Sequence, residues 1–335
     1  MKGLKILLAV IVVIGAISAY MYIGFQRRLA PLTVGESRMF RVAEGRPLKD
    51  VLEDLQKEGV IRDASATLSY ATMKRKNVAV DKGTYEVKPG QDADQILAAL
   101  RKPVRIMVRI PEGWWIARVA KRLEEKEVCS ADEYIKLANS PGEFQEFVKI
   151  KLPEKSLEGY LYPDTYDLPP GTGAKDTIIM QLQTFEKKVA KDLKPDTDLN
   201  RVLTIASMVE LEAATDEERP KVAGVIENRL KKGQRLELDA TVLYAMQEWK
   251  NLGQGEVRKV ISPYNTYLNG GLPPGPIGSP SLKSIEGALK PDSHPYFFYV
   301  ARPNRTHYFS ATYSEHMAAI RKARAEWKEE SAKTK

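Results

Sequence analysis

The first pattern in the sequence is an uninterrupted hydrophobic run near the start of the chain. The 20 residues from Ile6 to Phe25 carry no charge and are mostly Ile, Leu, Val and Ala. As a helix they span about 30 Å, enough to cross the core of a bilayer. A cleaved signal peptide is the rival interpretation, but its apolar region usually covers only about 7–15 residues. We therefore expect an uncleaved membrane anchor at residues 1–25 and a linker at 26–39.

A second pattern combines alternation with helical spacing, and it recurs. The segment Phe40–Gly45 alternates like a strand and is followed by apolar residues at helical intervals from Leu48 to Leu55. The segment Val108–Gly113 begins a second copy, and Gly83–Gly90 begins a partial third. Each copy predicts a strand, a tight turn and an amphipathic helix. Such units are small α+β modules.

The second half of the chain predicts more helix. Helices are expected at about residues 177–193 and 198–213, and a third ends near Gly233. The stretch Gly270–Gly278 is too rich in Gly and Pro for either helix or central strand. Two aromatic runs within 297–309 predict a hairpin. The fold class expected for the chain is α+β.

Composition narrows the possible functions. The chain has 52 Lys and Arg against 44 Asp and Glu, a net charge of +8. The charges alternate in sign, as in residues 121–127, so we expect no nucleic-acid partner; the positive balance suits an anionic membrane or polymer instead. The single cysteine excludes an internal disulfide, and the three histidines lack ligand spacing. No phosphate-binding loop is present. We expect neither metal nor cofactor.

One acid stands out by its position on a predicted helix. On a helical wheel, Ile205, Ala206 and Val209 form an apolar face, and Glu210 lies on its shoulder. Glu212 falls on the opposite shoulder. A carboxylate beside an apolar stripe is partly desolvated, which prepares it to hold a proton at neutral pH. Cleavage of a glycosidic bond needs such an acid, although taken alone a Glu beside a helix face is usually a solvated or ion-paired residue.

The surroundings of Glu210 carry a family resemblance. The motifs occur in a fixed order: Leu157–Tyr166, Ala206–Glu212, Glu218–Val225, Asn228–Leu230, Leu238–Ala245, Tyr264–Tyr267 and Gly271–Ile277. This series closely resembles the YceG-like family, the endolytic murein transglycosylases of MltG type. The chain departs from the family pattern at Leu211, Glu237 and Ala240, among others, which leaves the details of substrate preference open.

The resemblance implies an organisation and a function. Residues 40–155 would be a LysM-like, substrate-binding region, and residues 156–335 a mixed α+β catalytic domain. The protein would be a single-pass protein of the bacterial cytoplasmic membrane, with its C-terminal domain on the periplasmic or extracellular side. It would cut the MurNAc-β-1,4-GlcNAc bond of nascent peptidoglycan strands and leave 1,6-anhydro-MurNAc ends, which would terminate strand elongation. Its partners would be glycan strands, the membrane and penicillin-binding proteins or other synthesis machinery.

The resemblance also implies roles for single residues. The family's catalytic glutamate lands on Glu210, which would protonate the glycosidic oxygen and then take a proton from the muramoyl C6 hydroxyl. Residues that would bind substrate are polar and lie in the matched motifs: Glu158, Asn228, Asp239, Thr241, Tyr264 and Asn265. A hydrolase, which would need a second carboxylate such as Glu212, Asp239 or Glu158, is one alternative. A non-catalytic peptidoglycan-binding scaffold for cell-wall synthases is the other.

Overall fold

The computed structural model describes residues 2–32, 37–43, 45–76, 79–253 and 255–333. It divides the chain into two compact units. The first comprises Met1–Ile106 with Asp167–Thr172, and the second comprises Met107–Tyr166 with Gly173–Lys335. The second strand–turn–helix copy, which we expected within the binding region 40–155, therefore belongs to the same unit as the helix that carries Glu210.

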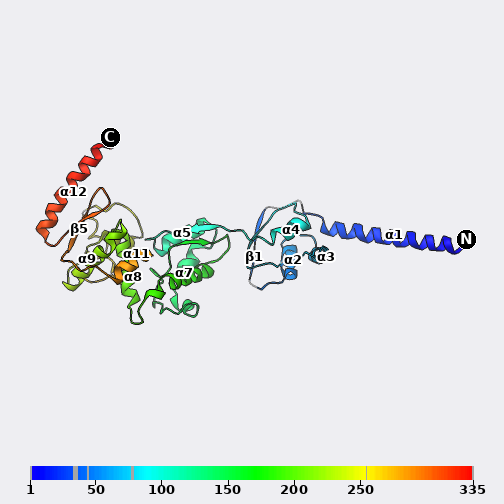
Figure 1. Cartoon of the computed structure of the whole chain (residues 1–335), viewed down its shortest axis with the longest axis horizontal. Helices are drawn as coiled ribbons and strands as arrows, with labels where there is room; N and C mark the ends of the chain where they lie inside the picture. Colours follow the sequence, from blue (N-terminus) through cyan, green and yellow to red (C-terminus); the bar gives the residue numbers. More distant parts are fainter. Residues whose placement is uncertain (1, 33–36, 44, 77–78, 254, 334–335) are drawn as a thin grey trace. The chain divides into compact units, whose positions relative to one another are not determined.

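The first helix, α1 (Lys2–Leu29), contains the uninterrupted apolar run (Figure 1). The most apolar 18-residue stretch within Gly3–Leu29 has a mean hydropathy of 2.6, and none of it is buried by the rest of the chain. By length and composition the helix can cross a membrane. It continues four residues beyond the predicted end at 25, because Gln26, Arg27 and Arg28 are good helix formers.

The first unit is built on two of the three predicted strand–helix copies. Strands β1 (Arg38–Val42) and β2 (Gly83–Val87) pair antiparallel, with Arg38 opposite Val87 and Val42 opposite Gly83. Its other elements are the helices α2 (Leu48–Lys57), α3 (Ala64–Met73) and α4 (Ala93–Ala99). Glu44, in the first predicted turn, lies outside the described residues.

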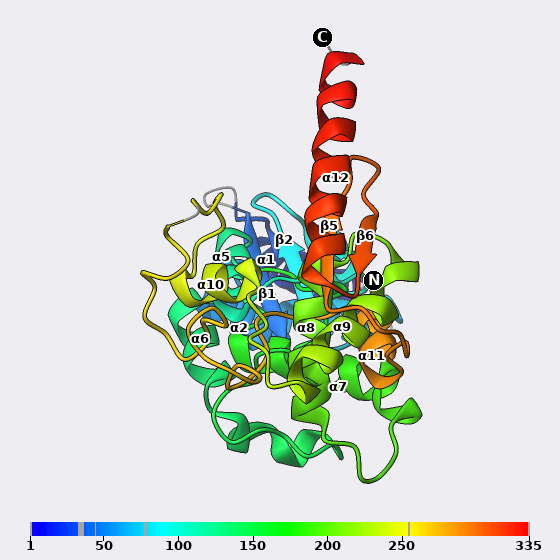
Figure 2. The same cartoon turned by 90° about the vertical axis from the view of Figure 1, so that its left-hand side faces the viewer.

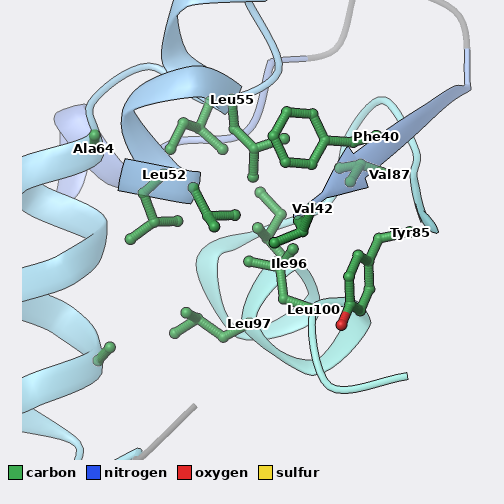
Figure 3. Close-up of a cluster of buried hydrophobic side chains, with 13 residues drawn as sticks. Phe40, Val42, Leu52, Leu55, Ala64, Tyr85, Val87, Ile96, Leu97 and Leu100 are labelled. Atoms are coloured by element: carbon green, nitrogen blue, oxygen red, sulfur yellow. The ribbon is translucent and has the colours of Figure 1, made fainter. Parts of the chain in front are cut away.

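The core of this unit confirms the predicted strand and helix spacing, because residues at the predicted apolar positions are the buried ones. Side chains from β1, β2, α2 and α4 point into one cluster (Figure 3). Leu52, Leu55 and Leu100 are fully buried there, and so is Tyr85, whose hydroxyl donates to the Asp81 carbonyl. Burial of each such side chain stabilises the folded state by about 1.5–3 kcal/mol. The LysM-like identity of the module stays a prediction.

The second unit begins with the remaining copy. Strand β3 (Met107–Arg109) pairs with β4 (Thr165–Asp167), not with a strand of another copy. Between and after these strands lie α5 (Ile116–Glu125), α6 (Ala131–Ala138), the 3₁₀ helix η1 (Pro141–Phe147), α7 (Ala174–Lys188) and η2 (Ala190–Asp192). The helix predicted at 177–193 is therefore α7 and η2, which begin earlier and end at about the expected place.

The rest of this unit surrounds one central helix, α8 (Leu199–Glu212). Around it lie η3 (Asp216–Glu218), α9 (Arg219–Lys231), α10 (Asp239–Met246) and α11 (Leu282–Leu289). The predicted hairpin is confirmed as β5 (Phe298–Ala301) and β6 (His307–Ser310). Helix α12 (Tyr313–Lys333) packs on the hairpin and extends beyond it (Figure 2). The mixed α+β fold class is thus confirmed.

Candidate active site

Helix α8 is more deeply buried than an amphipathic wheel predicts. Asp198 caps it, as expected, by accepting a hydrogen bond from the Arg201 amide at 3.0 Å. All seven residues from Leu203 to Val209 are buried, so apolar contacts surround the helix on every side. A helix buried all round is a central packing element. Its two acids follow this buried run, at the C-terminal end.

Glu210 is held by a dense set of donors. Its Oε2 accepts hydrogen bonds from the Ser281 amide at 2.8 Å, the Ser281 hydroxyl at 2.5 Å and the Ser284 hydroxyl at 2.8 Å. The Arg219 guanidinium adds an ion pair at 3.1 Å. Only 9% of the Glu210 side chain and 11% of the Arg219 side chain are exposed. The carboxylate thus ties α8 to the first turns of α9 and α11.

This environment differs from the one that the wheel predicted for Glu210. The wheel places Glu210 beside apolar residues, whereas in the structure its carboxyl group is surrounded by a guanidinium and hydrogen-bond donors. These partners come from segments that a helical wheel does not include. The geometry is that of a buried structural ion pair.

Glu212 lies in a different environment, although it is only two residues further along. Its exposure is intermediate, as that of Glu210 is, but its partner differs: it accepts a hydrogen bond from the Tyr299 hydroxyl of β5 at 3.0 Å. Burial raises its pKa to about 7; the Asp239 charge adds to this, while the Tyr299 hydrogen bond and Arg229 oppose it. An acid with a pKa near neutrality can both give and take a proton at neutral pH.

Tyr299 is itself held in place by the neighbouring His307. Its ring meets the His307 ring edge-on, with centroids 5.3 Å apart. His307 is fixed in turn by Glu218, whose carboxylate lies 2.7 Å from Nδ1 and accepts the His307 amide hydrogen at 2.9 Å. Burial and the Glu212 charge raise the pKa of Tyr299, which keeps its hydroxyl protonated as a donor. Hydrogen bonding and packing therefore hold Glu212 in one orientation.

Of the predicted substrate-binding residues, Asp239 is the one near Glu212. It begins α10, and its carboxylate accepts a hydrogen bond from the Tyr267 hydroxyl at 2.6 Å. The Asp239 charge contributes to the raised pKa of Glu212, which places the two carboxyls within electrostatic range. The Asp239 charge therefore acts on Glu212, whereas Glu210 is paired with Arg219.

Three other predicted residues use their polar groups inside the protein. Asn228 donates to the carbonyls of His294 and Tyr296, at 2.8 and 2.9 Å, which holds the chain before β5. Asn265 is fully buried and donates to two loop carbonyls, at 2.6 and 2.8 Å. Thr241 is fully buried and lies 2.9 Å from the Thr266 hydroxyl. In this conformation all three shape the loops, and their role as glycan contacts stays a prediction.

The last two, Glu158 and Tyr264, come together through Tyr244. Glu158 is 5% exposed and accepts hydrogen bonds from the Ile116 amide, at 3.1 and 3.2 Å, and from the Tyr244 hydroxyl, at 3.3 Å. Burial raises its pKa to about 8. The Tyr264 ring packs on Tyr244 with centroids 4.8 Å apart. In this conformation the carboxyl group of Glu158 bonds inside the protein, and its role as a glycan contact stays a prediction.

The Gly- and Pro-rich loop packs tightly against the Gly113 turn. The Gly113 amide donates to the Ser279 carbonyl at 2.7 Å, and the Ser279 amide to the Trp114 carbonyl at 2.9 Å. A Cβ on Gly278 would lie 2.7 Å from the Gly113 carbonyl, so no other residue fits at that position. This contact fixes the segment that contains Ser281.

Several residues around the two acids are not among the predicted site residues. Neither Tyr299 nor Arg219 was predicted, nor were the two serines that hold Glu210. Ser281 alone has a local signal, since Ser directly before a helix is a common N-cap. Within the described residues, no group of three or more His, Cys, Asp or Glu side chains is placed to hold a metal ion.

Comparison with known proteins identifies the family of the chain. The model of the YceG-like family matches residues 40–322. An endolytic murein transglycosylase of Bacillus subtilis is 30% identical over 300 residues, which cover 84% of this chain and 83% of that protein. Another, of Streptococcus pneumoniae, is 29% identical over 331 residues; the match covers 87% of this chain but only 60% of that longer protein.

A solved structure matches as well. The crystal structure of a YceG-like protein of Listeria monocytogenes superposes with a TM-score of 0.57 at 30% identity. The match covers 85% of this chain and 99% of that one. With a family model that spans most of the sequence and relatives that share its length and fold, the chain belongs to the YceG-like family.

Proposed function

We propose that this protein is a membrane-anchored endolytic transglycosylase of peptidoglycan and that Glu212 is its catalytic acid and base. The relatives named as murein transglycosylases support the reaction class. The observation that carries the residue assignment is the environment of Glu212: partly exposed, bonded to a neutral phenol, with a pKa of about 7. The family resemblance implies Glu210 for this role. In the structure the Glu210 carboxylate instead pairs with Arg219 and accepts hydrogen bonds from Ser281 and Ser284.

The proposed reaction needs one carboxyl. Protonated Glu212 gives its proton to the glycosidic oxygen as the bond from muramoyl C1 to that oxygen breaks, which releases the GlcNAc end as an alcohol. The resulting carboxylate takes the proton of the muramoyl C6 hydroxyl as that oxygen bonds to C1. The 1,6-anhydro ring closes and Glu212 is protonated again. Because the nucleophile belongs to the substrate, its effective concentration is high and no bound water is required.

The neighbours of Glu212 fit this cycle. The Tyr299 hydroxyl donates to Glu212 and stabilises the carboxylate that exists between the two proton transfers. Asp239 is near enough to raise the pKa of Glu212, which keeps the acid protonated at the start. Asp239 is also the group that would activate water in a hydrolase, which makes hydrolysis the second candidate.

The apolar helix α1 supports a location at the membrane. We propose that this helix anchors the protein in the bacterial cytoplasmic membrane and that the remaining chain works on the outer side, where nascent glycan strands lie. The division of labour that we propose gives glycan binding to residues 40–155 and catalysis to residues 156–335. Partnership with penicillin-binding proteins or other synthesis machinery belongs to the same proposal.

Mass spectrometry of the digestion products tests the reaction and the residue together. The full chain in detergent is incubated with uncrosslinked glycan strands, alongside Glu212→Gln and Glu210→Gln, and folding of each variant is checked by its unfolding curve. We expect anhydro ends from the parent and at least a 100-fold loss in Glu212→Gln. Reducing ends, heavier by one water, would indicate a hydrolase, and no cleavage a scaffold. Loss of cleavage only in a folded Glu210→Gln variant would return the role to Glu210.

A further inference from the structure

Four aromatic side chains in the second unit form a continuous row. Trp249 lies against Trp115, with ring centroids 6.1 Å apart and the planes tilted by 34°. Trp115 meets Tyr244 edge-on at 6.2 Å, and Tyr244 packs on Tyr264 at 4.8 Å. The row brings together residues more than a hundred positions apart in the sequence.

The row is buried at its centre and open at one end. Trp115 is 4% exposed, whereas Trp249 is 54% exposed. A single exposed aromatic residue needs no explanation, but this one extends a packed cluster into solvent. Trp and Tyr also combine a flat apolar face with a polar edge. A pyranose ring has the matching surface, with apolar C–H groups on its faces and hydroxyls around its rim.

Hydrogen bonds to Glu158 hold two parts of the row in place. Its carboxyl accepts the Ile116 amide hydrogen at the start of α5, next to Trp115, and the Tyr244 hydroxyl hydrogen. Trp115 is the N-cap residue of α5 and has no side-chain cap of its own. Glu158 therefore supplies a distant N-terminal cap. A platform fixed on both sides in this way loses little entropy when a ligand binds.

One member of the row lies on the helix that begins with Asp239. Helix α10 starts at Asp239, whose charge influences Glu212, and Tyr244 follows five residues later. At 1.5 Å and 100° per residue the two are separated by about 7.5 Å along the helix axis and by about 140° around it. A sugar ring on the aromatic row would thus be a different ring of the strand from the one at the acids.

We propose that the aromatic row of Trp249, Trp115, Tyr244 and Tyr264 forms a glycan subsite that binds a β-1,4-linked N-acetylamino sugar of the strand, apart from the ring being cut. This inference rests on the proposed function, since it places the subsite on the same glycan strand. Trp249 provides the stacking face and Tyr264 a hydroxyl, while the buried Trp115 and Tyr244 support them from within the protein. Glu158 is a positioning residue that never touches the sugar.

The experiment uses intrinsic fluorescence. The four tryptophans of the chain are Trp114, Trp115, Trp249 and Trp327, all in the second unit. Glycan that binds only to the first unit therefore does not change the tryptophan fluorescence directly. The full chain in detergent, carrying Glu212→Gln so that nothing is cleaved, is titrated with a chitooligosaccharide. Trp249→Ala and Trp249→Phe are made in the same background.

A matched control is available in Trp327 of α12, which is 49% exposed and far from this row in the sequence. We expect Trp249→Ala to weaken binding about 10-fold, Trp249→Phe to retain most of the affinity, and Trp327→Ala to leave it unchanged. Equal affinity of Trp249→Ala and its parent, or no saturable signal in the parent, would overturn the subsite. Failure of the catalytic proposal looks different: the chain with Glu212 restored would bind the oligosaccharide yet release no anhydro ends from glycan strands.

Discussion

The buried carboxyl of Glu158 makes the stability of the second unit depend on pH. Burial raises its pKa to about 8, against 4.5 for an ordinary glutamate. The folded state therefore binds this proton more tightly than the unfolded state. Its contribution to stability is complete below about pH 4.5 and is lost as the pH rises through about 8. Glu158→Gln keeps the shape and one acceptor oxygen but does not titrate.

The size of the effect follows from the two pKa values. At about 1.4 kcal/mol per pH unit, the interval from 4.5 to about 8 corresponds to about 5 kcal/mol in all. Between pH 5 and pH 8 the parent should lose about 3 kcal/mol relative to Glu158→Gln. The extra amide hydrogens of Gln shift the difference by a constant amount, so the slope with pH, and not the offset, carries the prediction.

Urea unfolding of the full chain in detergent, followed by tryptophan fluorescence at several pH values, measures this slope. All four tryptophans lie in the second unit, so the signal reports the unit that contains Glu158. Glu329→Gln, at an exposed position of α12, is the control and should show no such slope. A difference between parent and Glu158→Gln that stays flat from pH 5 to pH 8, or that falls, would refute the reasoning.

Three further predictions concern the acids and the unit boundary. Glu210→Gln should lower the free energy of unfolding by about 2 kcal/mol, because the Arg219 guanidinium then keeps only the Asp216 carboxylate as an ion-pair partner; an unfolding curve like the parent's would contradict this. Tyr299→Phe removes the hydrogen bond that lowers the pKa of Glu212, so the alkaline limb of the cleavage profile should move up by about one pH unit, and an unmoved limb would count against Glu212. A fragment that begins at Leu157 lacks β3 and α5 and should show no cooperative unfolding, whereas one that begins at Met107 should unfold cooperatively.

Local structure could be predicted from the sequence because local forces decide it. The apolar spacing from Leu48 to Leu55 matches α2, whose buried side chains are those at the predicted positions. Asp198 caps α8 because a short carboxylate before an apolar run can reach the free amides of the first turn. The anchor helix needs nothing beyond its own composition.

The environments of the two acids could not be predicted in this way. Glu210 meets Arg219 nine residues away, but its serine partners lie 71 and 74 residues further along the chain. Glu212 meets Tyr299 across 87 residues. Helical periodicity reports which face is apolar and nothing about which polar groups the fold brings to it. Desolvation of Glu210 was therefore foreseeable from its wheel position, and its ion pair was not.

The spacing of the two acids explains why neighbours in one motif can have such different roles. Residues two apart on a helix point about 200° away from each other. Glu210 therefore faces α9 and α11, while Glu212 faces the β5–β6 hairpin. A buried ion pair seldom stabilises a fold more than apolar packing would, so the Glu210 contacts are better explained by what they orient. We therefore propose that Glu210 fixes the rotation of α8 against two helices and so positions Glu212 toward Tyr299.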